Sequence, residues 1–379
     1  KQDILVEGLA ESLNQETAKI TFKDKQKKQH VNLPLESLTN SHAAVLNVIL
    51  DKLEEQFSLS TSLIGVGHRV VHGGSKFHQS VQVNQETLEQ IAACTPLAPL
   101  HNPANIAGIE SLQSRFPSIP QIAVFDTSFH QTMPEKAFTY AIPGSLAKEK
   151  HIRRYGFHGT SHRYITQQTA KYFNKPIGKT NLITAHLGNG ASVASIANGA
   201  SVDTSMGMTP LEGLVMGTRC GDLDPGIFDF LISLGHSPTE ISEILNKQSG
   251  LLGISGISND MRTICEHATQ GHKACQLALE VFCFRAAKHI AAMMISLKKV
   301  DALVFTGGIG ENSITVRQQI VKHLNILGFI LNNELNSNLE SSDQGNKLAI
   351  KISEDHSTPV LIIPTDEESM IVQDTLDLI

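Results

Sequence analysis

A chain of 379 residues is long for a single hydrophobic core and is comfortable for two domains. Hydrophobic residues make up 41% of the chain and charged residues 18%, which is the composition of an ordinary globular protein. A formal net charge of -6 argues against nucleic acid or an anionic membrane as the main partner, so any anion-binding site must be a local basic pocket.

The cysteines and the N-terminal residues indicate the cellular compartment in which the chain works. The five cysteines form an odd set without a C-x-x-C pair, which is typical of reduced thiols in a cytosol rather than of a disulfide framework or a zinc site. Residues 1–4 hold no apolar signal region, and no charge-free stretch approaches the length of a membrane span. We therefore expect a cytoplasmic enzyme with no membrane partner.

The first part of the chain predicts a group of strands. Residues 4–13, 17–23 and 29–33 have strand patterns joined by polar turns, which predicts an antiparallel meander. Residues 64–74 predict a buried strand that ends in a glycine turn and has Arg69 in its middle. A buried cation needs an anionic partner, so Arg69 is either half of a structural ion pair or a ligand-binding arginine, and the flanking glycines favour the second.

A helix and a strand then lead to a candidate catalytic carboxylate. Asn102 is the predicted cap of a helix that has Pro103 at its first position. The apolar residues 121–125 predict a strand that delivers Asp126 at its carboxyl end, where ligands are met in open α/β sheets. Asp126 is therefore a candidate metal-binding or phosphate-organising residue, with helix capping as the alternative.

Two histidines stand beside glycines in residues 153–162. The spacing of His158 and His162 suits zinc, but no acidic residue follows His158 as a zinc-protease helix requires, so we do not expect metal ligation. A histidine held between glycines before a helix N-terminus can instead donate a hydrogen bond to an anion.

Residues 181–205 predict a three-stranded antiparallel meander with two tight turns. His186, Asn189 and Ser192 surround the two glycines of the first turn, whose backbone N–H groups can approach an anion closely. The turn is therefore either a phosphate cradle or an ordinary Asn-Gly hairpin.

Three later stretches carry further candidate ligand-binding residues. The loop 206–226 is dense in glycine, aspartate and proline, and it exposes a second arginine, Arg219. Asp260 precedes a helix, and it either caps that helix or contacts a ligand. The strand 302–306 leads through the glycine turn 307–312 into a helix. That geometry offers N–H groups to a nucleotide, although the spacing matches neither the P-loop nor the full dinucleotide fingerprint.

The C-terminal part holds the longest predicted helix and a last strand. The helix spans residues 273–299, and one apolar stripe is predicted to face the core: Leu277, Val281, Phe284, Ala287, Ala291 and Met294. The last strand, 360–363, runs into residues 364–368, which puts two carboxylates at a strand end before a closing helix.

Eight motifs, in order over nearly the whole chain, resemble those of the acetate kinase family, in the acid-kinase branch of the actin-like and sugar-kinase superfamily. The motifs are GVGHRVVHGG (65–74), PLHNPA (99–104), VFDTSFHQTMP (124–134), RRYGFHGTSH (153–162), HLGNGAS (186–192), DTSMGMTPLEGLVMGTRCGDLDP (203–225), FTGGIGEN (305–312) and IPTDEE (363–368). Individually several are weak, but jointly they are highly specific.

The resemblance implies an α/β fold of two duplicated ribonuclease-H-like domains of the actin-like ATPase type. Each would be a mixed sheet flanked by helices, with an interdomain cleft. Residues 1–127 and 368–379 would form the N-terminal acid-kinase domain, and residues 128–367 the C-terminal nucleotide-binding domain. The resemblance also implies a homodimer and reversible transfer of the ATP γ-phosphoryl group to acetate by direct in-line displacement, giving acetyl phosphate and ADP. Mg²⁺ would be the metal, with Mn²⁺ as an alternative.

The resemblance further assigns roles to single residues. Arg69 and Arg219 would clamp the carboxylate and the transferring phosphoryl group, and His158 would stabilise the transition state. Asp126 and Glu367 would place the metal or its bound waters, so that Asp126, His158 and the two arginines are the implied catalytic residues. The implied acyl pocket consists of Val71, Leu100, Phe157 and Pro210, with Arg69 on the carboxylate. The implied nucleotide-binding residues are His186, Leu187, Gly188, Asn189, Gly190, Asp260, Met261, Arg262, Gly308, Ile309, Gly310, Glu311 and Asn312.

One departure from the family pattern lies at the start of the sequence. The family opens with an apolar strand, a turn rich in Asn, Gly and Ser, and a lysine, and nothing like this segment precedes Ile4. Either the sequence begins after residues that were clipped, or this version lacks a central strand of its first sheet, which would expose the sheet core.

Two alternative functions stay open. Propionate or butyrate kinase is the nearest alternative within the same class. A non-catalytic, actin-like nucleotide-binding protein is the alternative from a different class. The two arginines and His158 speak against it, since a nucleotide binder has no use for a second anion clamp.

Overall fold

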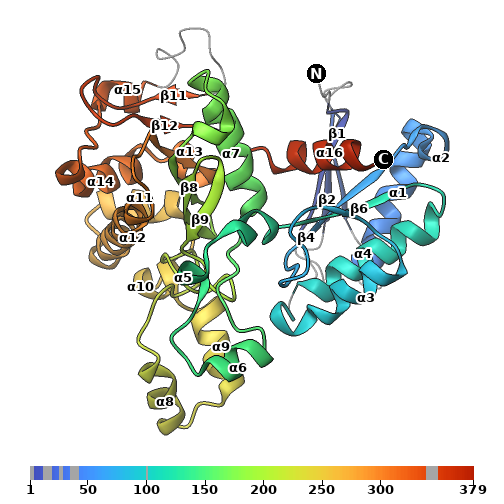
Figure 1. Cartoon of the computed structure of the whole chain (residues 1–379), viewed down its shortest axis with the longest axis horizontal. Helices are drawn as coiled ribbons and strands as arrows, with labels where there is room; N and C mark the ends of the chain where they lie inside the picture. Colours follow the sequence, from blue (N-terminus) through green and yellow to red (C-terminus); the bar gives the residue numbers. More distant parts are fainter. Residues whose placement is uncertain (1–3, 12–18, 25–28, 35–41, 100, 339–348) are drawn as a thin grey trace. The chain divides into compact units, whose positions relative to one another are not determined.

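The structure is a computed structural model that describes residues 4–11, 19–24, 29–34, 42–99, 101–338 and 349–379. The chain divides into two compact units, one formed by Lys1–Phe125 with Glu368–Ile379 and the other by Asp126–Glu367. Figure 1 labels most of the helices and strands of both units. Among the described residues, no helix combines the length and the apolar character needed to cross a bilayer.

The first unit opens with the predicted antiparallel meander, which the structure confirms. Its strands pair in chain order: β1 (Val6–Glu11), β2 (Lys19–Asp24) and β3 (Gln29–Pro34). Ile20 and Phe22 are two residues apart on β2, so they point to the same face. There they pack against Val45 of α1 (His42–Phe57) and form a small core.

A second three-stranded sheet lies in the same unit, in the order β4-β6-β5. Its strands are β4 (Val66–Val70), β5 (Val81–Gln82) and β6 (Gln121–Phe125), with β4 and β6 parallel. The unit's other helices are α2 (Leu59–Ser62), α3 (Gln85–Ala93), α4 (Asn102–Arg115) and α16 (Glu367–Leu378). A Cβ at Gly67 would lie 2.4 Å from Ile371, so a glycine in β4 lets α16 approach the strand closely.

Two predictions for this unit are wrong. Arg69 is exposed rather than buried, because it alternates along β4 with Val70, and Val70 is the residue that faces the core. Asn102 does not cap α4, since His101 occupies the cap position without a side-chain capping bond. The buried Asn102 amide instead accepts from the His72 N–H (3.2 Å) and donates to the His72 carbonyl oxygen (3.0 Å), which fixes the chain just beyond β4.

The second unit is built on a six-stranded mixed sheet in the order β11-β12-β10-β7-β8-β9. Its strands are β7 (Leu182–Leu187), β8 (Ala191–Ala197), β9 (Ala200–Thr204), β10 (Ala302–Thr306), β11 (Ile350–Lys351) and β12 (Val360–Ile362). β7, β8 and β9 form the predicted antiparallel meander, which is confirmed. β10 runs parallel to both β7 and β12, so these three strands end at the same edge of the sheet.

Helices cover both faces of this sheet (Figure 1). α7 (Gly159–Tyr172) places Ile165 in a core with Leu182, Ala194 and Val304, and α12 (Lys273–Met293) packs against β7 and β8. The remaining helices of the unit are α5 (Glu135–Phe138), α6 (Gly144–Glu149), α8 (Gly226–Ser233), α9 (Pro238–Lys247), α10 (Gly250–Ser255), α11 (Met261–Thr269), α13 (Gly307–Asn312), α14 (Ile314–Leu324) and α15 (Asn333–Ser337). The predicted α/β class, with mixed sheets flanked by helices, is confirmed.

The apolar stripe predicted to face the core along α12 is wrong in part. Leu277 and Phe284 are each 52% exposed, whereas Ala287 is buried as expected. The buried face is instead formed by Cys275, Ala278, Leu279, Phe282, Cys283, Ala286, Ala287, Ile290 and Met293. Apolar residues surround most of this helix, so their spacing alone does not select the face that packs.

Candidate active site

His158 lies between Asp126 and the start of α7. Its backbone is left-handed (φ 56°, ψ 25°), and α7 begins at the next residue, Gly159. The Gly159 N–H donates to the carbonyl oxygen of Asp126 across 2.8 Å, and a Cβ at Gly159 would lie 2.3 Å from that oxygen. Only glycine fits there, so this contact brings together two residues that the sequence predicts to be catalytic, Asp126 and His158.

The ring of His158 stacks on the ring of His186, a predicted phosphate-side residue at the end of β7. The ring centroids are 4.3 Å apart and the planes are inclined by 25°. His186 Nδ1 is 2.8 Å from Ser161 Oγ, which in turn is 2.8 Å from Thr365 Oγ1. The stack therefore fixes two imidazole rings beside each other, one on a helix N-terminus and one on a strand end.

Two further histidines lie behind this stack, fully buried. His162 reaches Ser192 and Thr184, and His130 reaches Ser201 and the Phe157 carbonyl oxygen. Burial lowers the pKa of His130 to about 4 and holds the pKa of His162 well below its usual value. Both rings are therefore neutral at neutral pH and act as hydrogen-bonding groups. No group of three or more metal-ligating side chains lies among the described residues.

The turn between β7 and β8 carries the glycines predicted to face an anion. The Gly188 N–H donates to the Gly190 carbonyl oxygen across 3.0 Å, which makes the turn tight. A Cβ at Gly190 would lie 3.4 Å from His158 Nε2 and 3.6 Å from Arg219 Nη1. The turn, the predicted catalytic histidine and the second predicted arginine therefore converge on one point. This convergence is the central geometric observation on the site.

The turn is also fixed from the side. Asn189 accepts from the Gly217 N–H through its carbonyl oxygen (2.9 Å) and from Asn259 Nδ2 through its side-chain oxygen (3.1 Å). A Cβ at Gly217 would lie 1.8 Å from that side-chain oxygen, so glycine is required for the approach. Leu187, just before the turn, is fully buried and anchors it to the sheet.

Arg219 lies in the loop that follows β9 and is half-buried rather than exposed. Its Nη1 donates to the carbonyl oxygen of Pro210 across 3.2 Å, and burial lowers the pKa of the guanidinium from its usual value. Pro210 is a predicted acyl-pocket residue, so the contact joins the predicted clamp to the predicted pocket. Phe157, another predicted pocket residue, is buried beside His158 in the chain.

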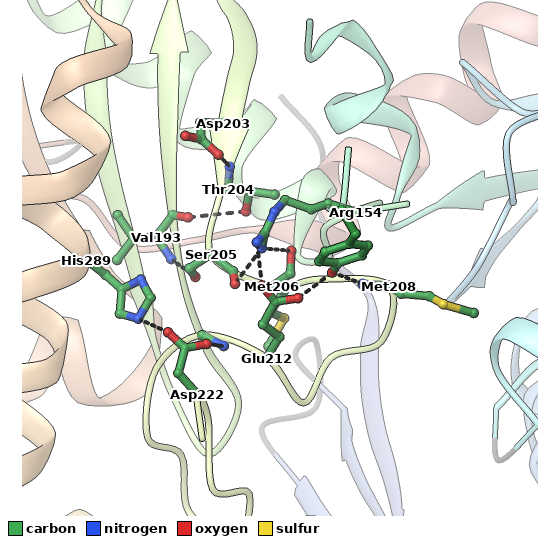
Figure 2. A network of polar contacts seen from close by, with 12 residues as sticks. Arg154, Val193, Asp203, Thr204, Ser205, Met206, Met208, Glu212, Asp222 and His289 are labelled. Carbon is green, nitrogen blue, oxygen red and sulfur yellow. Dashed lines mark hydrogen bonds and ion pairs between the residues drawn. The ribbon is translucent and has the colours of Figure 1, made fainter. Parts of the chain in front are cut away.

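A polar network holds the Pro210 end of this loop (Figure 2). Arg154 Nη1 donates to the carbonyl oxygens of Ser205 (2.9 Å) and Met206 (3.0 Å), and its Nη2 pairs with Glu212. The Tyr140 hydroxyl donates to the other oxygen of Glu212 and accepts from the Met208 N–H across 2.9 Å. Burial and the bond to Glu212 raise the pKa of Tyr140, so it remains a hydrogen-bond donor.

A second anchor holds the loop just beyond Arg219. Asp222 Oδ1 accepts from the Gly213 N–H (2.8 Å), and Asp222 Oδ2 lies 3.1 Å from His289 of α12 (Figure 2). Burial opposes ionisation of Asp222, but the hydrogen bonds from His289 and Gly213 outweigh it and hold the pKa of this carboxyl below its usual value. Arg219 thus sits between two fixed points of one loop.

The predicted nucleotide-side residues lie at two helix N-termini. Asp260 caps α11, accepting from the Arg262 N–H (2.8 Å), and its carboxylate also pairs with the Arg262 guanidinium (2.6 Å). The Arg262 side chain is exposed and Met261 is buried. The prediction left Asp260 either as a cap or as a ligand contact, and the structure shows the cap.

The glycine turn after β10 forms the short helix α13. Glu311 turns its carboxylate back to accept from the N–H groups of Gly307 (2.8 Å) and Thr365 (3.0 Å). Any contact between residue 311 and a nucleotide would therefore come from its main chain. The end of α13 is held by Arg317, a fully buried residue that donates to the carbonyl oxygens of Gly310 (3.0 Å) and Glu311 (2.8 Å). Burial lowers the pKa of Arg317 to about 10.

Other predicted site residues lie in the following places. Gly308, Ile309 and Asn312 belong to α13, with Gly308 and Asn312 exposed. Val71 is buried just beyond β4, and its N–H donates to Asn105 Oδ1 across 3.1 Å. Leu100 lies outside the described residues. Arg69 and Val71 belong to the first unit, so their share in one site with the second unit stays a prediction.

The chemistry of two carboxylates suits a hard cation. Asp126 is 1% exposed at the end of β6, and Glu367 is half-buried at the start of α16. Mg²⁺ prefers oxygen ligands and is usually bound by one or two carboxylates together with substrate phosphates, not by a complete protein cage.

Comparison with known proteins identifies the family. The acetokinase family matches residues 1–373 of this chain. The chain belongs to the acetokinase family. An acetate kinase from Shewanella woodyi is 49% identical over 378 residues, covering 100% of this chain and 93% of that protein. This membership makes the chain a phosphotransferase with a carboxyl group as acceptor.

Solved structures of acetokinases share the fold. A propionate kinase from Francisella tularensis subsp. tularensis SCHU S4 is 48% identical, with a TM-score of 0.92 over 99% of this chain and 93% of that chain. The acetate kinase of Porphyromonas gingivalis is 39% identical, with a TM-score of 0.90 over 99% of this chain and 94% of that chain.

Several residues around the site were not singled out by sequence reasoning. Glu212 forms an ion pair with Arg154, which lies 58 residues away in the sequence. Thr365 lies within hydrogen-bonding distance of Ser161, which is 204 residues away in the sequence. All four lie within family motifs, which was the only available signal. The sequence indicates Ser192 only as a residue beside the turn, whereas the structure places its hydroxyl between His158 and His162.

Proposed function

We propose that this acetokinase transfers the γ-phosphoryl group of ATP reversibly to acetate, giving acetyl phosphate and ADP. The observation that carries the proposal is the convergence of His158 Nε2 and Arg219 Nη1 on Gly190 in the tight turn after β7. Two cationic or donor groups aimed at a glycine turn are the arrangement expected around a transferring phosphoryl group.

The chemistry explains why the site needs these groups and no general base. Acetate is already ionised at neutral pH, because carboxyl groups titrate at about 4. The barrier is instead the repulsion between an anionic nucleophile and a polyanionic phosphate. Arg219 and His158 would offset that charge, and Arg69 of the first unit would hold the acetate carboxylate. Direct in-line displacement then depends on positioning and electrostatic stabilisation.

We propose Mg²⁺ as the metal, with Mn²⁺ as an alternative, held by Asp126 and Glu367 or by their bound waters. A bound Mg²⁺ neutralises charge on the nucleotide phosphates. Asp126 supports this role because its backbone is fixed by Gly159 and its side chain is buried beside the site. The nucleotide would lie along the turn 187–190, the N-terminus of α11 and α13.

We infer that Val71, Leu100, Phe157 and Pro210 form a small acyl pocket that favours acetate over longer acids. Each extra methylene changes binding by about 1–3 kcal/mol in such a pocket, so propionate is discriminated against and not excluded. Propionate kinase is the second candidate, because the similar structure from Francisella tularensis carries that name.

Hydroxylamine trapping tests these functions directly. The full chain would be incubated with ATP, Mg²⁺ and hydroxylamine, and with acetate, propionate or butyrate in turn. We expect hydroxamate with acetate and less with the longer acids. The highest kcat/KM with propionate would reassign the substrate. No hydroxamate with any acid, while nucleotide still binds, would favour the non-catalytic nucleotide-binding alternative.

We also propose a cytoplasmic homodimer. Support comes from α8, an eight-residue helix with no buried residue that exposes several large apolar side chains: Ile227, Phe228, Phe230 and Ile232, followed by Leu234. Contiguous exposed apolar surface of this kind marks an interaction site. The family resemblance makes a second copy of the chain the expected partner. The two units would correspond to the acid-kinase and nucleotide-binding domains.

A further inference from the structure

A chain of hydrogen bonds leads from His158 into the core of the second unit. His158 Nδ1 is 2.9 Å from Ser192 Oγ, and Ser192 Oγ is 2.8 Å from His162 Nε2. His162 Nδ1 is 2.7 Å from Thr184 Oγ1, which donates to the carbonyl oxygen of Ala194 across 3.4 Å. Ser192, His162 and Thr184 are each fully buried, so water does not compete for these bonds.

The carbonyl oxygen at the end of the chain gives the bonds a direction. A carbonyl only accepts, so the Ala194 contact is a hydrogen bond when Thr184 places its single hydroxyl hydrogen there. Thr184 then accepts from His162, which places the His162 proton on Nδ1 and leaves Nε2 as an acceptor. Ser192 donates to that nitrogen, and its oxygen accepts from His158. With the Thr184 hydrogen on Ala194, each further step follows because a hydroxyl has one hydrogen and a neutral imidazole has one N–H.

The direction of these bonds decides whether the His158 nitrogen that faces the site carries a proton. With Nδ1–H directed at Ser192, the proton-exchanging nitrogen is Nε2. That atom is the one near Gly190, on the side where Arg219 Nη1 also approaches. His158 can then donate to a phosphoryl oxygen from Nε2 only as the imidazolium ion, which adds a full positive charge to the donor.

We propose that Ser192, backed by His162 and Thr184, is a positioning residue that keeps the Nδ1 proton on His158 and presents Nε2 to the transferring phosphoryl group. The inference rests on the proposed function in one respect, the contact between His158 and that group. Ser192 itself touches no substrate in this proposal. It acts by fixing the tautomer and the orientation of the ring, as hydrogen-bonding partners of catalytic histidines do.

Ring-nitrogen NMR tests the tautomer without any turnover. The full chain would be labelled with ¹⁵N-histidine, and the His158 signals would be assigned by their loss in His158→Gln. In the neutral ring we expect a protonated Nδ1 and an unprotonated Nε2. A neutral His158 with its proton on Nε2 would overturn the proposal.

Ser192→Ala is the matching variant, and Ser195→Ala is its control. Ser195 is also fully buried on β8, and its hydroxyl has no hydrogen-bond partner within the described structure. Ser192→Ala should move the neutral His158 proton toward Nε2 and lower kcat by about 10- to 100-fold, with the KM for ATP unchanged. Ser195→Ala should change neither. Equal effects from both variants would show that Ser192 is merely structural.

A second pair keeps the proposal testable if Ser192→Ala does not fold. Thr184→Val has nearly the same shape and removes the acceptor at the end of the chain, whereas Thr184→Ser retains it. We expect the tautomer shift in Thr184→Val and the wild-type spectrum in Thr184→Ser. An unchanged His158 spectrum in Thr184→Val would contradict the directional argument. A wild-type chain that forms no acyl phosphate but has the expected spectrum would overturn the proposed function alone.

Discussion

The guanidinium of Arg219 donates a hydrogen bond to the carbonyl oxygen of Pro210 across 3.2 Å, so one loop holds its cation against its own backbone. Arg219→Ala removes one of the groups proposed to stabilise the transferring phosphoryl. We expect kcat to fall by about 100- to 1000-fold, with an unchanged circular dichroism spectrum. Arg219→Lys keeps the charge and loses the planar fork, so its kcat should be intermediate. Near-normal turnover in Arg219→Ala would contradict the proposed role.

The network around Glu212 predicts a combined effect on stability and on the acid substrate. Glu212→Gln removes the charge that Arg154 pairs with and leaves this guanidinium poorly satisfied. We expect the free energy of unfolding to fall by about 1–3 kcal/mol and the KM for acetate to rise, because Pro210 lies two residues away. Chemical denaturation and initial rates measure the two quantities. Glu243→Gln, which removes an exposed pair with Lys247, should change both by little.

A side chain at position 159 is expected to have a strong steric effect at the site. Gly159→Ala would place a Cβ 2.3 Å from the carbonyl oxygen of Asp126, so the start of α7 must move and carry His158 with it. We expect kcat to fall by at least about 100-fold, as displacements of about 1 Å can do. Gly108→Ala is the control, since a Cβ there meets nothing within 4 Å inside α4. That control should raise the free energy of unfolding by about 0.5–1 kcal/mol without changing kcat.

The buried histidines predict a pH dependence of stability. Burial lowers the pKa of His130 to about 4 in the folded chain, whereas an unfolded histidine titrates at about 6.5. Between these values the unfolded chain binds the proton and the folded chain does not. The stabilisation is therefore complete above pH 6.5 and is lost as the pH falls toward 4, by about 1.4 kcal/mol per pH unit for each such histidine.

Denaturant titrations between pH 7 and pH 4.5 measure that slope. The lowered pKa of His162 should contribute in the same direction. His130→Gln should reduce the slope by the share of one histidine, whatever its effect on stability at pH 7. His323→Gln, at an exposed position, is the control and should leave the slope as in the wild type. An unchanged slope in His130→Gln would show that this ring becomes protonated in the folded chain.

The exposed surface of α8 predicts a change of oligomeric state. Phe230 and Leu234 are each 62% exposed, and replacing both by aspartate would place two charges in the proposed interface. We expect sedimentation velocity to shift from dimer to monomer. Ile326→Asp, at a position 91% exposed outside α8, should leave the dimer intact. A dimer that survives the double substitution would place the interface elsewhere.

The sequence predicted local features of the fold well. The meander of β7, β8 and β9 is defined by alternating side chains and glycine turns within about 25 residues, so its register needs no distant information. The burial of Arg69 and the packed face of α12 were wrong because both depend on which neighbour covers a strand or a helix. Apolar residues around most of α12 leave several faces equally acceptable to a pattern.

The candidate site shows the same division. The motifs single out His158, His186 and Arg219 as candidates, and Asp260 was correctly expected near a helix start. The partners that orient them were not found, because Glu212 reaches Arg154 across 58 residues and Ser192 reaches His158 across 34. A single sequence does not encode such pairs as a spacing. They appear only when the strands and loops are assembled.

The left-handed backbone of His158 introduces conformational strain at the candidate site. A residue with a side chain at φ 56° costs about 1–2 kcal/mol relative to glycine in the same conformation. The ring contacts act in the opposite direction, because His158→Gly would also remove the stack on His186 and take one partner from the fully buried Ser192 hydroxyl. Backbone strain and side-chain contacts therefore oppose each other at this one position, so a stability measurement on His158→Gly reports their difference and has to be made apart from any measurement of activity.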